Sequence, residues 1–257
     1  MSVLVIEHFL KNISKNYGSK TVINNISLDI EAGQFVTMLG TSGSGKTTLL
    51  KMVNRLVEPD NGSIEINNEK ITDMNIIELR KNIGYVVQQI GLFPHVTVEK
   101  NIATVPELKG WEEERIKARV VELMELVNLP YDDYAYRFPK QLSGGQQQRI
   151  GVARALAANP KIMLLDEPFG AVDAITRKDL QTQIKKIHQD LEEKTFLFVT
   201  HDINEAFLLG DKVVIMDQGE ILQYDTPKNI VKNPGSPFVR NLLETKYEEE
   251  SLWSELR

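Results

Sequence analysis

The sequence contains no cysteine among its 257 residues. This absence excludes a disulfide framework, a thiolate metal site and a cysteine nucleophile, and it fits a reducing compartment. Long apolar runs are also missing, because no stretch approaches the about 18 apolar residues that a membrane-spanning helix needs. The N-terminus does not show a basic segment followed by a long apolar one, as a signal peptide would. We therefore expect a cytoplasmic chain that reaches a membrane only through a partner.

An excess of positive charge is lacking as well. The 30 Lys and Arg residues are outnumbered by 36 Asp and Glu residues, which gives a net charge of −6. This balance argues against non-specific nucleic-acid binding as the main task. Hydrophobic residues make up 42% and charged residues 26%, which excludes a mainly disordered chain. The length suits one large α/β domain with a sub-lobe or two small domains, and we favour the first.

A glycine-rich loop near residue 45 carries the strongest signal. It fits the pattern G-x-x-x-x-G-K-T, with the apolar run Phe35–Leu39 before it and the helix-compatible run Leu49–Leu56 after it. Glycines let backbone N–H groups converge on phosphate oxygens, and the following helix adds its positive N-terminal end. We expect Lys46 to reach β- and γ-phosphates and Thr47 to bind Mg²⁺. The expected phosphate-binding residues are Gly40, Thr41, Ser42, Gly43, Ser44, Gly45, Lys46, Thr47 and Thr48.

Two acidic residues follow an apolar strand candidate later in the chain. The run Ile162–Leu165 leads directly into Asp166 and Glu167. At the end of a strand, Asp166 is suited to hold Mg²⁺. Glu167 points to the other side, where it can act as general base or position an attacking water. Alone, this pattern more often marks the boundary between a strand and a turn, but the phosphate loop upstream favours the catalytic interpretation.

A second anion site is predicted at Leu142–Gln146, which reads L-S-G-G-Q. Ser143 is a candidate N-cap ahead of the helix-like segment Gln147–Ala158, and the two glycines leave backbone N–H groups open at a helix N-terminus. Two phosphate-binding elements in one chain leave two arrangements open. Either both contact one nucleotide, or each completes a site whose other half lies on a second molecule.

The remaining segments alternate between strand and helix patterns. Short β-rich runs from Val3 to Gln34 predict a small antiparallel sheet, which residues 62–68 continue into a polar turn. Helical spacing of apolar residues predicts amphipathic helices over Trp111–Leu129 and Leu180–Leu191. The charged segment Glu244–Arg257 reads as a surface helix or as a disordered tail. Short apolar runs typical of buried parallel strands are Ile162–Leu165, Phe196–Val199 and Val213–Met216.

Together with Gln88 and His201, these motifs resemble the nucleotide-binding subunit of an ABC transporter, in order and spacing, over essentially the whole chain. The resemblance implies an ATP- and Mg²⁺-dependent ATPase with the P-loop ABC ATPase fold of the α/β class. That fold has a RecA-like parallel-sheet core, an N-terminal antiparallel β subdomain and an inserted α-helical lobe. In this family the L-S-G-G-Q segment of one subunit closes over ATP on the phosphate loop of the other, which implies a homodimer.

The same resemblance implies roles for single residues. Gln88 matches the Q-loop glutamine near Mg²⁺ and the attacking water, and Asp173 matches the D-loop aspartate. His201 matches the switch histidine that contacts the γ-phosphate, and Tyr17 matches the aromatic that stacks on adenine. Without the resemblance, Tyr17 fits a half-buried strand tyrosine equally well, and for His201 we would favour a satisfied histidine at a strand end. The implied catalytic residues are Glu167, His201 and Gln88; the nucleotide contacts beyond the loop are Tyr17, Ser143, Gly144, Gly145, Gln146 and Asp173; the metal ligands are Thr47, Gln88 and Asp166.

Two local stretches narrow the resemblance. Tyr85–His95 and Phe169–Arg177 resemble ATPases of the glycine betaine, carnitine and choline uptake systems. Thr41 stands where proline is commonest and Val172 where leucine is, and neither departure removes a functional group. Many of these relatives carry paired regulatory CBS domains after the ATPase core. We expect no such pair within these residues, and hence no gating through one.

The resemblance thus implies the motor subunit of an importer for a small solute, a quaternary amine such as glycine betaine, carnitine or choline. It implies a position at the cytoplasmic face of the cell membrane. The implied partners are integral permease subunits and an extracytoplasmic solute-binding protein or domain, and not nucleic acid. The alternatives are uptake of another small amine or amino acid, and a soluble ABC ATPase acting on nucleic acid or ribosomes. A P-loop kinase would leave Leu142–Gln146 unexplained.

We predict that residues 1–240 form the ABC ATPase domain and residues 241–257 a charged C-terminal tail. Within the domain we expect a core of residues 1–89 and 160–240 and a helical lobe of residues 90–159, because strand-like runs are missing from that interval. The mixed apolar loop Ile90–Val98 follows Gln88. We therefore predict that it moves with the lobe and docks against a membrane subunit.

Overall fold

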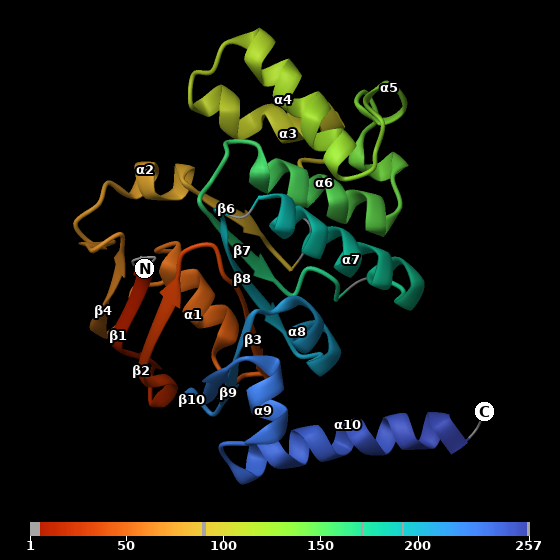
Figure 1. Ribbon diagram of the computed structural model, residues 1–257. Coiled ribbons are helices and arrows are strands. Elements are labelled where there is room, and N and C mark those ends of the chain that lie inside the picture. Colours follow the sequence, from red (N-terminus) through yellow and green to blue (C-terminus); the bar gives the residue numbers. More distant parts are fainter. Residues whose placement is uncertain (1–5, 89–90, 171, 192, 256–257) are drawn as a thin grey trace, which may run out of the picture. The chain divides into compact units, whose positions relative to one another are not determined.

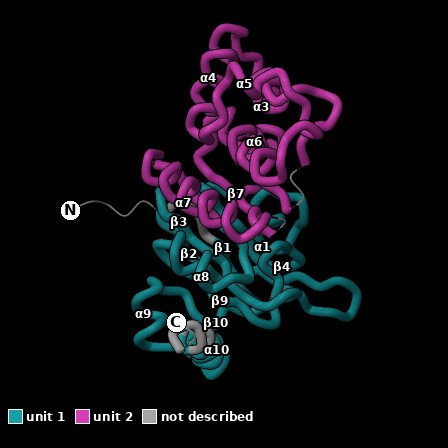
Figure 2. The backbone as a smooth tube through the Cα atoms, turned by 90° about the vertical axis from the view of Figure 1, so that its right-hand side faces the viewer, with its two compact units in different colours: residues 1–70, 198–257 teal, residues 71–197 magenta. Residues whose placement is uncertain are grey.

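The computed structural model of this chain describes residues 6–88, 91–170, 172–191 and 193–255 (Figure 1). The chain forms two compact units, one made of Met1–Lys70 and Phe198–Arg257 and the other of Ile71–Leu197 (Figure 2). The first unit is therefore built from both ends of the chain. Among the residues described, no helix is both long and apolar enough to cross a membrane.

The first unit contains two sets of paired strands. In the antiparallel sheet the order is β2-β1-β4-β5, which confirms the sheet predicted before the phosphate loop. In the second set the order is β10-β9-β3, with β9 parallel to β3 and β10 antiparallel to β9. The elements are β1 Ile6–Tyr17, β2 Lys20–Glu31, β3 Phe35–Gly40, α1 Lys46–Val53, β4 Asn61–Ile66, β5 Glu69–Lys70, α8 Ile203–Leu209, β9 Lys212–Asp217, β10 Glu220–Asp225, α9 Pro227–Lys232 and α10 Pro237–Glu255.

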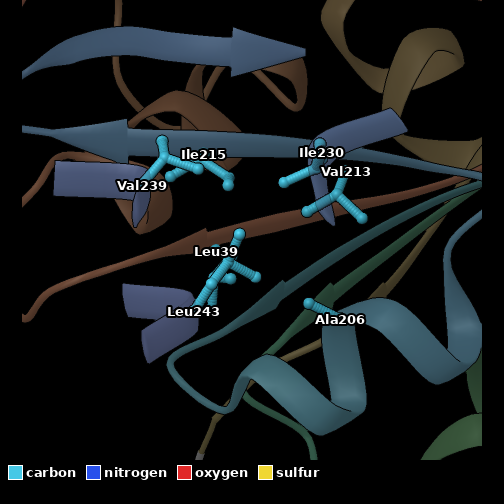
Figure 3. Close-up of a cluster of buried hydrophobic side chains, with 7 residues drawn as sticks. All are labelled: Leu39, Ala206, Val213, Ile215, Ile230, Val239 and Leu243. Atoms are coloured by element: carbon cyan, nitrogen blue, oxygen red, sulfur yellow. The ribbon is translucent and has the colours of Figure 1, made fainter. Parts of the chain in front are cut away.

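A cluster of buried apolar side chains joins β3 and β9 to the helices at the end of the chain (Figure 3). Val239 and Leu243 of α10 belong to this cluster. Helix α10 is thus anchored to the first unit by its N-terminal half, and of the two interpretations of Glu244–Arg257 the structure shows the helix as far as Glu255. The cluster consists of Leu39, Ala206, Val213, Ile215, Ile230, Val239 and Leu243.

The second unit combines parallel strands with a group of helices. β6 pairs in parallel with β7, and α3, α4 and α6 contact one another (Figure 1). Between β6 and β7 the described residues contain helices and connecting segments but no strand. The lobe boundaries at residues 90 and 159 stay a prediction, and residue 90 lies outside the described residues. The elements are α2 Ile76–Lys81, β6 Ile83–Val86, α3 Val98–Leu108, α4 Glu113–Leu126, α5 Tyr131–Tyr134, the short 3₁₀ helix η1 Pro139–Gln141, α6 Gly144–Leu156, β7 Ile162–Asp166 and α7 Ala174–Asp190; β8 Thr195–Thr200 passes from this unit into the first.

Several helix boundaries differ from those predicted. Helix α1 begins at Lys46 instead of Leu49, because the left-handed Gly45 (φ 101°) turns the chain directly into the helix. It ends at Val53 instead of Leu56, since Arg55 is left-handed (φ 47°). Helix α6 begins at Gly144, directly after the predicted N-cap Ser143 and three residues before the segment predicted as helical. Helices α4 and α7 end before the predicted Leu129 and Leu191.

Candidate nucleotide-binding and catalytic site

The phosphate loop connects the end of β3 to the start of α1, as the sequence predicts. Gly43 (φ 82°) and Gly45 (φ 101°) adopt the left-handed region, which glycine enters without a steric penalty. At Gly45 a Cβ atom would also lie 2.5 Å from Cδ1 of Ile23 and 2.7 Å from the carbonyl oxygen of Val22. Glycine at this position has no side chain to cover the first N–H groups of α1. An anion bound at this helix N-terminus would interact favourably with these groups and with the helix dipole.

Lys46 is folded onto the loop that precedes it. Its side chain is buried, and Nζ donates to the carbonyl oxygens of Gly40 and Thr41, both at 2.8 Å, and to Oγ of Ser44 at 3.4 Å. A ring of oxygen atoms compensates the burial of the ammonium group. Phosphate oxygens can replace these acceptors, so the loop holds a positive charge where the sequence predicts a triphosphate. Thr47 and Thr48 follow half-buried in the first turn of α1.

Tyr17 is the last residue of β1, and its side chain is 51% exposed. An exposed ring leaves surface for a stacked base. The Lys15 ammonium lies 5.6 Å from the centre of this ring and 2.6 Å from Oδ1 of Asp60. Asp60 also accepts the backbone N–H of Asn16 at 2.7 Å. The Lys15 hydrogen bond, followed by that of Asn16, lowers the pKa of the Asp60 carboxyl.

Asp166 ends β7 and is almost completely buried. The hydroxyl of Tyr85 donates to Oδ2 of Asp166 at 3.4 Å. Burial, with the Asp166 charge as the second cause, raises the pKa of Tyr85, so the phenol keeps its proton and remains a donor. Sequence reasoning did not single out Tyr85. The parallel register that places Tyr85 opposite Leu164 explains the contact, and that register has no local sequence signal.

Glu167 follows Asp166 in a left-handed conformation with φ 43°. This conformation costs a non-glycine residue about 1–2 kcal/mol, and such strain is concentrated at functional sites. The amide nitrogen of Gln88 donates to Oε2 of Glu167 at 3.1 Å. Two of the three predicted catalytic side chains are therefore in direct contact, although 79 positions separate them in the chain.

The L-S-G-G-Q segment forms the N-terminus of α6. Oγ of Ser143 accepts the N–H of Gln146 at 3.3 Å, and Oε1 of Gln146 accepts the N–H of Ser143 at 2.9 Å. This reciprocal cap explains why the helix begins at Gly144. A Cβ atom added at Gly144 would have no other atom within 4 Å, whereas a Cβ added at Gly145 would overlap Cγ2 of Thr176.

Asp173 caps α7 and is exposed. Its carboxylate accepts the N–H groups of Thr176 at 3.0 Å and of Ile175 at 3.2 Å. Hydrogen bonds from Thr176, the backbone one first, lower the pKa of Asp173. The carboxylate therefore stays ionised at the N-terminus of α7.

His201 is exposed at the end of β8. The residue before it, Thr200, is buried and donates its hydroxyl to Oε2 of the buried Glu205 at 2.5 Å. The same hydroxyl accepts the N–H of Asp202 at 3.0 Å. Both neighbours of His201 are thus fixed by hydrogen bonds. Glu205 is a second residue that sequence reasoning missed, since a glutamate inside a short helix gives no sign of being buried.

The two units carry different predicted residues. Tyr17, the loop residues 40–48 and His201 lie in the first unit, and Gln88, residues 143–146, Asp166, Glu167 and Asp173 lie in the second. Throughout the described part of the chain, no three His, Cys, Asp or Glu side chains cluster as a metal-binding group. This finding leaves a Mg²⁺ site of the usual kind open, because Mg²⁺ is commonly bound by one or two carboxylates together with substrate phosphates.

Comparison with known proteins gives related sequences over most of the chain. Residues 23–170 match the family described as ABC transporter. The choline transport ATP-binding protein OpuBA and the glycine betaine/carnitine/choline transport ATP-binding protein OpuCA, both of Bacillus subtilis, are each 52% identical over 235 residues, or 91% of this chain. The chain spans 61% of the length of each of these two relatives. The glycine betaine uptake system ATP-binding protein YehX of Escherichia coli is 49% identical, over 89% of this chain and 74% of that protein.

Solved structures agree with the expected fold. A dimeric post-hydrolysis state of the ATP-binding cassette MJ0796 bound to ADP and Pi is similar with a TM-score of 0.76 and 35% sequence identity, covering 86% of this chain and 98% of that one. The likeness confirms the mixed α/β class with its parallel and antiparallel strands. With the matched residues 23–170 spanning the phosphate loop, the L-S-G-G-Q helix and the Asp166-Glu167 strand, the chain belongs to the ABC transporter family as an ATP-binding cassette.

Proposed function

We propose that this chain is the ATP-hydrolysing subunit of an ABC importer for a small solute, a quaternary amine such as glycine betaine, carnitine or choline. The supporting observation is the 52% identity, over 91% of the chain, to two relatives named for transport of these solutes. The proposal places the chain at the cytoplasmic face of the cell membrane. Its partners are permease subunits and an extracytoplasmic solute-binding protein or domain.

The residues present fit ATP with Mg²⁺. Thr47 offers a hydroxyl oxygen, Asp166 a carboxylate and Gln88 an amide oxygen, and Mg²⁺ prefers such oxygen ligands. Bound there, Mg²⁺ would neutralise charge on the phosphates. Tyr85 supports this assignment, because its phenol keeps a hydrogen bond on Asp166 and so fixes the carboxylate.

Hydrolysis is proposed to depend on Glu167 and Gln88. Gln88 holds Oε2 of Glu167, which orients the carboxylate that would position or deprotonate the attacking water. Lys46 would leave its loop carbonyls for the β- and γ-phosphates, and His201 would contact the γ-phosphate. The chemistry then depends on charge stabilisation at the phosphate, as in other phosphoryl-transfer sites.

A homodimer would complete the site. Ser143 uses its oxygen as an acceptor for the N–H of Gln146, and this leaves its own hydroxyl proton to donate to a phosphate. Gly144 is unobstructed beside it, so a ligand can approach the backbone closely. The dimeric state of the similar cassette MJ0796 supports this arrangement.

The solute is the least constrained part of the proposal. A sulfate/thiosulfate import ATP-binding protein of Thermosynechococcus vestitus is 45% identical over the same 91% of the chain. An importer for another small solute is therefore the second candidate. Neither Tyr17 nor the phosphate loop distinguishes the two, since both would contact nucleotide only.

The test is reconstitution with the permease subunits that co-purify with the chain. Uptake is measured for glycine betaine, carnitine, choline, an amino acid and sulfate, together with phosphate release. Glu167→Gln should lower the hydrolysis rate by about 10²–10⁴ while ATP binding persists, whereas Glu114→Gln, an exposed change on α4, should keep the parental rate. Co-purification with ribosomes or nucleic acid, or ATP-independent uptake, would contradict the proposal.

A further inference from the structure

Two neighbouring strands of the first unit end together beside the phosphate loop. β3 and β9 are parallel, and Gly40 is paired with Met216. Thr41, which follows the end of β3, and Asp217, the last residue of β9, therefore lie at the same edge. The hydroxyl of Thr41 donates to Oδ1 of Asp217 at 3.1 Å. This hydrogen bond connects the phosphate loop to the turn between β9 and β10.

That turn makes a second contact with the loop. Gln218 (φ 46°) and Gly219 (φ 83°) are both left-handed, and Asp217 is paired with Glu220, as in a tight two-residue hairpin. The N–H of Gly219 donates to the carbonyl oxygen of Ser44 at 3.2 Å. The turn thus holds the loop both near its start and just before Gly45.

The turn is itself held by β2. The N–H of Asn24 donates to the carbonyl oxygen of Gly219 at 2.8 Å. A Cβ atom on Gly219 would lie 2.7 Å from the carbonyl oxygen of Val22, and a Cβ on Gly45 would lie equally close to that atom. Loop and turn therefore pack against one point of β2, so a displacement of the turn displaces the loop.

Thr41 is held by hydrogen bonds at both its side chain and its carbonyl group. The carbonyl oxygen of Thr41 accepts a hydrogen bond from the Lys46 ammonium, while the Thr41 hydroxyl donates to Asp217. Thr41, Ser42 and Gly43 are otherwise exposed, so these hydrogen bonds order a segment that receives little packing. A proline here would fix φ by its ring but could not donate a hydrogen bond. Ordering the loop before a ligand arrives lowers the entropy cost of binding.

We propose that the turn Asp217–Glu220 braces the phosphate loop, with Asp217 as a positioning residue that acts through the Thr41 hydroxyl to set the affinity for nucleotide phosphates. This inference rests on the proposed function, since it concerns the same nucleotide. Asp217 does not contact the reacting atoms, so its loss changes Kd and KM for Mg-ATP and leaves kcat at saturation unchanged.

The experiment measures Kd by titration of the purified full chain with a fluorescent ATP analogue and Mg²⁺. Asp217→Ala and Thr41→Val each remove one partner and should each weaken binding about three- to tenfold, the size expected for one hydrogen bond. The double variant should be no weaker than either single one, because both remove the same bond. Asp217→Asn keeps an oxygen acceptor and should bind more tightly than Asp217→Ala.

The matched control is Thr245→Val, which removes an exposed threonine hydroxyl that bonds to the Asn241 carbonyl on α10. It should bind like the parent. Parental affinity in Asp217→Ala, equal affinity of the Asn and Ala variants, or additive losses in the double variant would each overturn the brace. A parent that fails to bind Mg-ATP would instead contradict the proposed function itself.

Discussion

Gly145 offers a sharp test of how α6, the helix that begins in the L-S-G-G-Q segment, is packed. It is buried in the first turn of α6, and a Cβ atom there would overlap Cγ2 of Thr176 and lie 4.0 Å from Cγ1 of Val172. Cγ2 of Thr176 cannot move away freely, because a β-branched side chain is restricted about χ1 and the Asp173 carboxylate holds the backbone N–H of Thr176 at 3.0 Å. Gly144, one residue earlier, has open space at the same position. The two glycines therefore predict opposite effects of one added methyl group.

The magnitude follows from comparing the two alanine variants. Both replace glycine by alanine in a helix and so gain up to about 1 kcal/mol in helix propensity, which cancels between them. What remains is the overpacking at Gly145, about 1–3 kcal/mol. One kcal/mol corresponds to about 2–4 °C in Tm for chains of this size. Gly145→Ala should therefore melt about 2–12 °C below Gly144→Ala.

The assay is thermal unfolding followed by circular dichroism, without nucleotide. Thr176→Ser removes Cγ2 and keeps the backbone N–H, so adding it to Gly145→Ala should close most of the difference. The same change in the parent, where nothing overlaps Cγ2, serves as the control. Equal melting of the two alanine variants, or no recovery in Gly145→Ala with Thr176→Ser, would refute the reasoning.

Further predictions concern the predicted docking loop, the phosphate loop and the ion pair between Lys15 and Asp60. Asn101 is fully buried, and its amide makes four hydrogen bonds to the backbone of residues 93–97. Asn101→Ala removes them, so hydrogen–deuterium exchange of this predicted docking loop should rise. Unchanged exchange would contradict the inference that Asn101 orders the loop. Lys46→Ala removes a charged donor and should weaken ATP binding by at least about tenfold in equilibrium dialysis; parental affinity would exclude the phosphate contact. The pKa of Asp60 is lowered, first by its hydrogen bond with Lys15. The ionised carboxylate therefore stabilises the fold at pH values above 3.8, the ordinary pKa of this group. That contribution is lost as the pH falls below 3.8 through the lowered pKa, so Asp60→Asn should show a shallower fall in Tm over this range, and parallel curves would count against it.

Local signals were sufficient for most of the architecture. Gly43 and Gly45 mark the phosphate loop because only glycine adopts their backbone angles without penalty, and apolar runs mark the buried strands β7 and β9. The structure confirms Ser143 as the N-cap of α6, and the S-x-x-Q pattern that it forms with Gln146 predicts the observed start at Gly144.

Contacts between distant residues had no such signal. Tyr85 meets Asp166 across 81 positions, and only the register of β6 against β7 brings them together. The left-handed conformation of Glu167 runs against the preference of its own side chain, so the surrounding structure must impose it. A sequence can therefore identify Asp166 and Glu167 as candidates, whereas the groups that orient them follow from the fold.

The contact that Thr41 makes could not be predicted from the sequence either. From the sequence, threonine in place of the commonest proline is neutral, because it removes no functional group. The structure shows that it adds one, a hydroxyl bound to Asp217 at the end of the neighbouring parallel strand. A substitution that is harmless by residue type can thus create a dependence on a second residue 176 positions away. Once either Asp217 or Thr41 has been changed, changing the other should consequently cost little more, which is the non-additivity that the double variant measures.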